Sequence, residues 1–179
     1  MSLNEQFFYA LHGLSGVSWP LDWLGVFLAG ALGPILFIGA LIFILKQPTF
    51  KQQFSVFTLI MLALSISVGF LLLGRAFYES PRPFAVLEIT TLVDHDPTNS
   101  FPSGHTIVYT SLAAAMWFVR REIGYWFLAG AVFIGLARIF VGIHWPTDIL
   151  GGLVLGVISG FIAYKIFPHK EYLKQKVHE

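Results

Sequence analysis

Five apolar stretches separated by polar links constrain the fold of this chain more than any other feature of its sequence. A helix needs about 20 mostly apolar residues to cross a bilayer. Only 12% of the residues are charged, about half the share typical of soluble domains. We therefore predict one all-α domain over residues 1–179, a polytopic membrane helix bundle with about five transmembrane helices: Pro20–Leu45, Phe54–Leu73, Thr106–Val119 with polar residues before it, Tyr125–Val141 and Ile149–Phe167.

The N-terminal segment Leu3–Leu14 is too short and too mixed in polarity to cross a membrane. It predicts either an amphipathic helix on the membrane surface or an arm packed on the bundle, and its sequence favours neither. No basic region of the kind that opens a signal peptide precedes the first apolar stretch, so we expect that stretch to be a retained span. Gly33 and Pro34 within it predict a kink.

Lysine and arginine residues predict the orientation of the spans. They follow the first, third and fifth spans, which a five-span topology places on one side, and basic residues of this kind mark the cytoplasm. The N-terminus and the long polar loop Tyr78–Phe101 should then lie outside; this loop could form a lid or be a plain connection. The basic residues are Lys46, Lys51, Arg120, Arg121, Lys165, Lys170, Lys174 and Lys176.

Three polar clusters fall at the predicted outer ends of the spans, where ionisable side chains are costly and usually functional. Three arginines in one place repel one another unless an anion lies between them, and the planar guanidinium suits phosphate. The net charge of +1 indicates no acidic partner such as nucleic acid, and the absence of cysteine excludes thiolate chemistry. The clusters are Arg75-x6-Arg82-Pro83, Pro102-Ser103-Gly104-His105 and Arg138-x5-His144-x3-Asp148.

The residue types in these clusters also suggest how a reaction could proceed. Ser103 and Gly104 precede a span, where helix N-terminal amides form an anion site. His144 and Asp148 are four residues apart and can share a helical face. The carboxylate could then orient the imidazole, while His105 could act as a general acid.

With these three motifs in their observed order and spacing, the chain resembles the type 2 phosphatidic acid phosphatase (PAP2) superfamily of membrane lipid phosphatases, from Arg75 to Asp148. The resemblance implies a metal-independent phosphatase without a cofactor. His144 would form a phosphohistidine, Asp148 would orient it, and His105 would protonate the leaving group. The implied phosphate-binding residues are Arg75, Arg82, Ser103, Gly104 and Arg138.

Two positions depart from the family pattern. Arg75 stands where lysine is usual, and Ala137 where serine is usual. In its short N-terminus, the Pro20-Leu21-Asp22 entry to the first span and the Ser100-Phe101-Pro102-Ser103 segment, the chain also resembles small bacterial undecaprenyl-diphosphate phosphatases, although those often carry aspartate at the position of Gly104. The expected reaction is undecaprenyl diphosphate to undecaprenyl phosphate at the outer, periplasmic face of a bacterial inner (plasma) membrane. Phosphatidylglycerophosphate, phosphatidate and lipid A phosphates remain alternative substrates, and the oligomeric state stays open.

Two other classes of function compete with this one. His105, His144 and Asp148 could form a two-histidine, one-carboxylate metal site, although nearby arginines would repel a cation. A transporter or proton relay would also carry buried charges, but at several depths rather than at one. The remaining histidines, His12, His95, His169 and His178, are expected to be packing or surface residues without a catalytic role.

Overall fold

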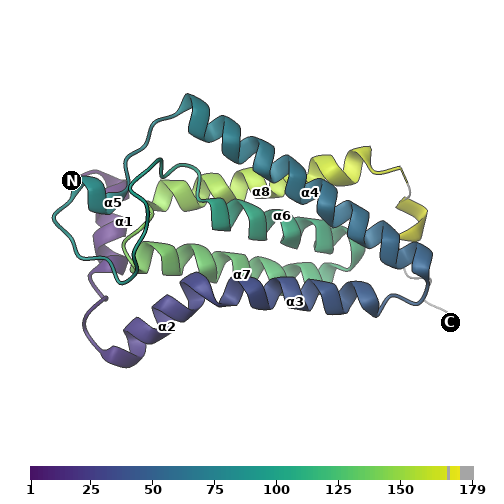
Figure 1. The fold of residues 1–179 in the computed structure, drawn as a ribbon, viewed down its shortest axis with the longest axis horizontal. Coiled ribbons are helices and arrows are strands. Elements are labelled where there is room, and N and C mark those ends of the chain that lie inside the picture. The colour runs from purple at the N-terminus through teal and green to yellow at the C-terminus, as the bar shows by residue number, and fades with distance from the viewer. Residues whose placement is uncertain (169, 174–179) are drawn as a thin grey trace.

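The computed structural model describes residues 1–168 and 170–173, which form a bundle of α-helices and one short 3-10 helix (Figure 1). This confirms the all-α class. The elements are α1 (Leu3–His12), α2 (Trp19–Gly30), α3 (Leu32–Leu45), α4 (Phe50–Phe77), α5 (Pro83–Val86), α6 (Gly104–Val119), α7 (Arg121–Phe140), α8 (Pro146–Ile166) and η1 (Lys170–Tyr172). His169, Lys174, Lys176 and His178, for which the sequence made predictions, lie outside the described residues.

Three of the helices, α4, α7 and α8, are long and apolar enough to cross a membrane. The pair α2 and α3, bent by 47° at its break, passes the same test only when its two helices are taken together, which gives three or four candidate spans. The remaining predicted span, Thr106–Val119, corresponds to α6, which has 16 residues. At 1.5 Å per residue it is about 24 Å long, less than a hydrocarbon core of about 30 Å. The count of five therefore stays a prediction.

The break between α2 and α3 has a local cause. Pro34 has no N–H to donate to the Gly30 carbonyl, and its ring crowds the preceding turn. The kink predicted at Gly33 and Pro34 is thus confirmed, with the bend just before them at Ala31. The break also leaves carbonyls at the end of α2 available to donors from elsewhere, which matters for the site described below.

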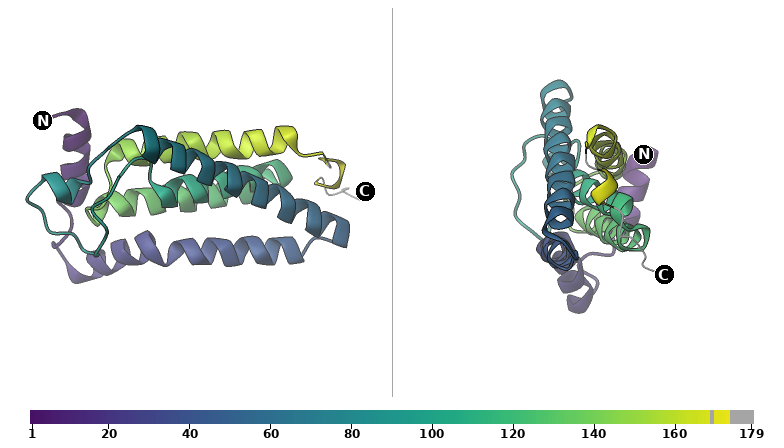
Figure 2. Two further views of the ribbon diagram at one scale, coloured as in Figure 1. Left: turned by 45° about the horizontal axis from the view of Figure 1, so that its top comes forward. Right: turned by 90° about the vertical axis from the view of Figure 1, so that its right-hand side faces the viewer.

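Helix α6 lies at the centre of the bundle, with α4 on one side and α7 and α8 on the other (Figure 2). Three glycines spaced four apart on α8 allow the closest approach: a Cβ added at Gly156 would lie 2.6 Å from Thr110 Cβ and 2.8 Å from the Ile107 carbonyl oxygen. Gly152 and Gly160 are equally crowded by α6. Small residues at this spacing are how membrane helices pack backbone against backbone.

The N-terminal helix α1 packs on the bundle, which is one of the two arrangements that the sequence left open. One face packs on α7 and α8, with Phe8 fully buried between the rings of His12 and Trp145. Leu3 and Phe7, away from this contact, are exposed. The packed arm is therefore confirmed, whereas contact of the exposed face with a membrane surface stays a prediction.

The long loop between α4 and α6 is closed on itself and tied to the bundle. The Ser100 N–H donates to the Ser80 carbonyl within the loop at 2.8 Å, and the Leu92 N–H donates to the Val141 carbonyl after α7 at 3.1 Å. The loop therefore lies against the turn between α7 and α8 at one end of the bundle (Figure 1). This contact brings loop residues to the predicted active-site end.

The glycine contacts predict a specific loss of stability. Gly156→Ala should lower the thermal unfolding temperature in detergent by about 5 °C, because its methyl group must displace the α6 backbone. Gly69→Ala in α4, where an added Cβ meets nothing within 4 Å, is the matched control and should not lower it. Tryptophan fluorescence during heating measures both, and equal behaviour of the two variants would contradict the packing described.

Candidate active site

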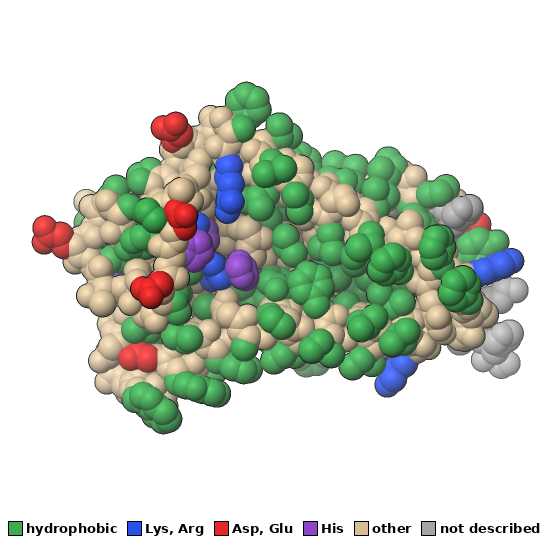
Figure 3. Space-filling model, viewed as in Figure 1, with side chains coloured by type: hydrophobic (Ala, Val, Ile, Leu, Met, Phe, Trp, Pro, Cys, Tyr) green, Lys and Arg blue, Asp and Glu red, His purple; other side chains and the backbone are tan. Residues whose placement is uncertain are grey.

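The three polar clusters meet at one end of the bundle, as predicted from their positions at the ends of the spans. Histidine and basic side chains lie next to one another there on the face shown in Figure 3. The cluster residues come from helix ends. Arg75 lies in the last turn of α4, Arg82 is the N-cap of α5, and Ser103, Gly104 and His105 are at the start of α6. Arg138 lies in the last turn of α7, His144 in the turn before α8, and Asp148 in the first turn of α8.

A Schellman motif ends α7 and presents His144. The Ile143 N–H donates to the Arg138 carbonyl at 3.2 Å and the Gly142 N–H to the Ile139 carbonyl at 3.0 Å. Gly142 has a φ of 90°, which a residue without a side chain adopts at little cost. The chain therefore turns sharply enough for His144 to face the first turn of α8.

His144 and Asp148 form a buried hydrogen-bonded pair. The Nδ1 atom of His144 lies 3.2 Å from Asp148 Oδ2, and both side chains are at most 2% exposed. The Trp145 N–H donates to the same carboxylate oxygen at 2.8 Å. Because the carboxylate accepts, the proton of a neutral imidazole is assigned to Nδ1.

The other ring nitrogen of His144 carries the free lone pair. Its Nε2 lies 3.2 Å from Nη1 of Arg82, and a guanidinium can only donate. Burial lowers the pKa of His144 to about 4, against the raising effect of the Asp148 hydrogen bond and with a further lowering by the charges of Arg138 and Arg82. At neutral pH the imidazole is uncharged and Nε2 is available as a nucleophile.

Two buried arginines at this end are held by neutral acceptors. Arg82 donates to the carbonyls of Thr98 (3.0 Å) and Ile143 (2.8 Å), and Arg138 donates to the Ala29 carbonyl (3.1 Å). Among residues 1–168 and 170–173, no carboxylate lies within ion-pair distance of either guanidinium. Burial, followed by the charge of Arg75, lowers the pKa of Arg82. Buried cations that bond no carboxylate directly are costly unless an anion joins them, so we expect an anion to bind here.

The start of α6 borders the same site. Ser103 is fully buried, and its hydroxyl oxygen accepts from the N–H and hydroxyl of Thr106 at 3.5 and 3.1 Å, so it caps the helix. A Cβ at Gly104 would lie 3.7 Å from the exposed Arg75 guanidinium. His105 is exposed, with its ring 6.1 Å from that of Tyr109. These positions fit the predicted roles, which stay predictions.

Two residues of the long loop belong to the site and were missed from the sequence. The fully buried Ser100 donates to Asp148 Oδ2 at 2.5 Å and lies 3.2 Å from His144 Nδ1. His95 contacts Arg138 at 3.2 Å, and its ring centroid is 6.3 Å from that of His144. The expectation that His95 has no catalytic role stays a prediction. His12 is confirmed as a packing residue, because its Nδ1 bonds the Phe140 carbonyl at 2.9 Å. The sequence signal for Ser100 and His95 was their position a few residues before the Pro102–His105 motif.

The metal site considered from the sequence does not assemble. Within the part of the chain that the structure describes, no group of three potential metal-ligating side chains comes together. The two nitrogens of His144 face Asp148 and the Arg82 guanidinium. Ala137, where the family pattern has serine, packs in an apolar cluster with Ala29 and Phe140.

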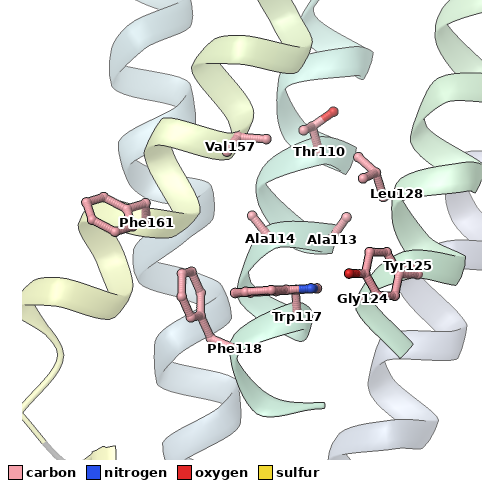
Figure 4. A pocket seen from close by; sticks show the side chains of 10 residues that line it. All are labelled: Thr110, Ala113, Ala114, Trp117, Phe118, Gly124, Tyr125, Leu128, Val157 and Phe161. Atoms are coloured by element: carbon pink, nitrogen blue, oxygen red, sulfur yellow. The ribbon is translucent and has the colours of Figure 1, made fainter. Parts of the chain in front are cut away.

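An apolar cavity of about 440 Å³ lies between α6, α7 and α8 near the opposite end of the bundle. Figure 4 shows the rings of Trp117, Phe118 and Phe161 at one end of it and Thr110, Leu128 and Val157 at the other. Its lining carries no charged side chain. Phosphate chemistry is therefore assigned to the charged end of the bundle and not to this cavity.

Comparison with known proteins gives a consistent result. Residues 54–172 match the PAP2 superfamily. The chain is 31% identical over 163 residues to undecaprenyl-diphosphatase BcrC of Bacillus subtilis, covering 91% of this chain and 83% of that protein. It is 32% identical to Escherichia coli YbjG, covering 83% and 76%. The crystal structure of Aquifex aeolicus LpxE is similar with a TM-score of 0.75 at 25% identity, covering 92% and 96%.

The buried His144 predicts how stability depends on pH. Its pKa falls from 6.5 to about 4 on folding, so between these values the unfolded chain binds a proton that the folded chain does not. The stability contributed by this group is complete above pH 6.5 and is lost as pH falls towards 4. His144→Asn keeps a donor to Asp148 but does not titrate. Thermal unfolding from pH 7 to 4 should show a smaller decline for this variant than for the unsubstituted protein; equal declines would contradict the assignment.

Proposed function

Since this chain belongs to the PAP2 superfamily and is a membrane phosphatase, we propose that it hydrolyses undecaprenyl diphosphate to undecaprenyl phosphate through a phosphohistidine. The substrate is supported by the similarity to undecaprenyl-diphosphatase BcrC over most of both chains. The observation that carries the mechanism is the unprotonated Nε2 of His144 beside the buried Arg82, which, like the buried Arg138, has no carboxylate within ion-pair distance among the described residues.

In the first step, the terminal phosphoryl group binds between Arg82 and Arg138, with Arg75 and the Gly104 amide at the edge of the site. Arg82 transfers its hydrogen bond from His144 Nε2 to a phosphate oxygen, which frees the lone pair. Nε2 attacks phosphorus, and the bond from phosphorus to the bridging oxygen breaks. The imidazole becomes cationic, and Asp148 stabilises the proton on Nδ1. The departing lipid phosphate takes a proton from His105, which enters this step as the imidazolium and leaves it neutral.

In the second step, water attacks the phosphohistidine and His105 accepts its proton. The phosphorus–nitrogen bond breaks, inorganic phosphate is released, and His144 and His105 return to their starting states. Both steps use charges already present in the folded site, so the guanidinium groups need little reorganisation as charge moves in the transition state.

The position of the site suits a substrate anchored in a bilayer. It lies at one end of the membrane helices, so a head group can reach it while the lipid tail stays among the acyl chains. The basic residues Lys46, Lys51, Arg120, Arg121 and Lys165 lie at the other end. By the distribution of positive charge, the proposed site faces the periplasmic side of a bacterial inner membrane.

Phosphate release from a panel of lipids tests this proposal. Detergent-purified protein, with EDTA present, should turn over undecaprenyl diphosphate faster than phosphatidylglycerophosphate, phosphatidate or lipid A. His144→Asn should abolish release while the protein remains folded by size exclusion and thermal unfolding. A faster reaction with a glycerophospholipid would replace the proposed substrate, and normal release by the variant would remove His144 as the nucleophile.

Ser100 predicts an effect on the rate rather than on substrate binding. Ser100→Ala removes a donor to Asp148 and a neighbour of His144 Nδ1, so the pair is held less firmly. We expect kcat to fall about tenfold, as for the loss of a hydrogen bond to a charged group, with KM nearly unchanged. Ser65→Ala is the matched control, because Ser65 only bonds the Met61 carbonyl on the exposed face of α4. A rise in KM alone would contradict this role.

A further inference from the structure

The hydrogen bonds of His95 determine which of its ring nitrogens carries the proton. Its Nδ1 lies 3.2 Å from the carbonyl oxygen of Asp96, which can only accept. Its Nε2 lies 3.2 Å from Nη2 of Arg138, which can only donate. Both contacts are satisfied only by a neutral imidazole with its proton on Nδ1 and its lone pair directed at Arg138.

Arg138 depends on this contact for its orientation. Its Nη1 donates to the Ala29 carbonyl at the end of α2, and its buried Nε has no partner among the described residues. One bond alone would let the planar guanidinium rotate about that contact. Two bonds, at Nη1 and Nη2, fix its plane, and the second of them is supplied by His95.

We propose that His95 is a positioning residue of the active site, which holds Arg138 ready for phosphate while the site is empty and yields Nη2 to a phosphate oxygen when substrate binds. This inference rests on the proposed function, because it assigns Arg138 to the phosphate. An anionic phosphate oxygen is a stronger acceptor than a neutral imidazole. His95 is exposed and comes from a loop, so its side chain has space to move aside.

The exchange depends on pH, because a protonated His95 would place an N–H donor against the Arg138 donor. The charged and titratable groups around it are Arg138 on α7, Arg82 before α5, His144 in the turn, His105 on α6 and its neighbour Asp96. Burial, followed by the charge of Arg82, lowers the pKa of His95. It is therefore neutral at pH 7 and protonates only in more acidic solution, where the contact is lost.

Two substitutions separate positioning from a merely structural role. His95→Ala removes the acceptor and should raise KM about tenfold, with a smaller change in kcat. His95→Gln supplies an amide oxygen that can accept from Arg138, and should restore KM to within about threefold at pH 7.5. Asp94→Asn, at the exposed neighbouring position, is the control and should leave KM unchanged.

The pH profile gives a second readout. Between pH 7.5 and 5.5, KM of the unsubstituted protein should rise more steeply than that of His95→Gln, whose amide does not titrate. Equal KM values for the alanine and glutamine variants, or parallel pH profiles, would overturn the proposal.

Binding of inorganic phosphate separates this inference from the proposed substrate. Its dissociation constant, measured from the rise in thermal unfolding temperature, should increase about tenfold in His95→Ala and recover in His95→Gln. The same pattern in a protein that hydrolyses none of the lipids would sustain the role of His95 and refute the proposed function. Turnover of undecaprenyl diphosphate with equal phosphate binding by all variants would refute the role of His95 alone. No phosphate binding by the unsubstituted protein would also overturn it.

Discussion

Burial of two guanidinium groups in an apolar bundle is the constraint on which the rest of the site depends. Each buried N–H needs an acceptor, yet a carboxylate would compete with the phosphate. The chain uses carbonyl oxygens, and carbonyls inside a helix are already bonded. The acceptors therefore come from places where helices stop: Ala29 at the α2 break, Thr98 in the long loop and Ile143 in the turn before α8. The irregular backbone at this end therefore supplies the acceptors for the two buried arginines.

The regular part of the bundle holds these irregular segments at fixed positions relative to one another. The glycines of α8 let α6 approach closely, and the Ser103 N–H donates to the Asp148 carbonyl at 3.1 Å. The start of α6, with its amides and His105, is thereby fixed relative to the His144 and Asp148 pair. Packing far from the chemistry thus determines the distance between the nucleophile and the expected proton donor.

Much of this architecture could be predicted from the sequence, because hydropathy reports spans and short motifs report helix ends. The bend at Pro34 and the meeting of Arg82, His144 and Asp148 followed from such local signals. Ser100 and His95 did not, since each acts through partners 43 to 48 residues away. Loop residues follow no periodic pattern that indicates which side faces a site. The span predicted at Thr106–Val119 does correspond to α6 (Gly104–Val119), although hydropathy does not report its burial by neighbouring helices.

The packing of α1 links the active site to the lipid or detergent that surrounds the protein. Phe8 contacts the Trp145 ring, and the Trp145 N–H holds Asp148. The same helix presents Leu3 and Phe7 as exposed apolar surface, which we expect lipid or detergent molecules to cover. Two contacts therefore connect that covering layer to the carboxylate behind the nucleophile. The choice of detergent or lipid in an assay therefore sets part of the environment of the reaction. Rates measured in different micelles can differ because the turn that carries His144 is packed differently in each.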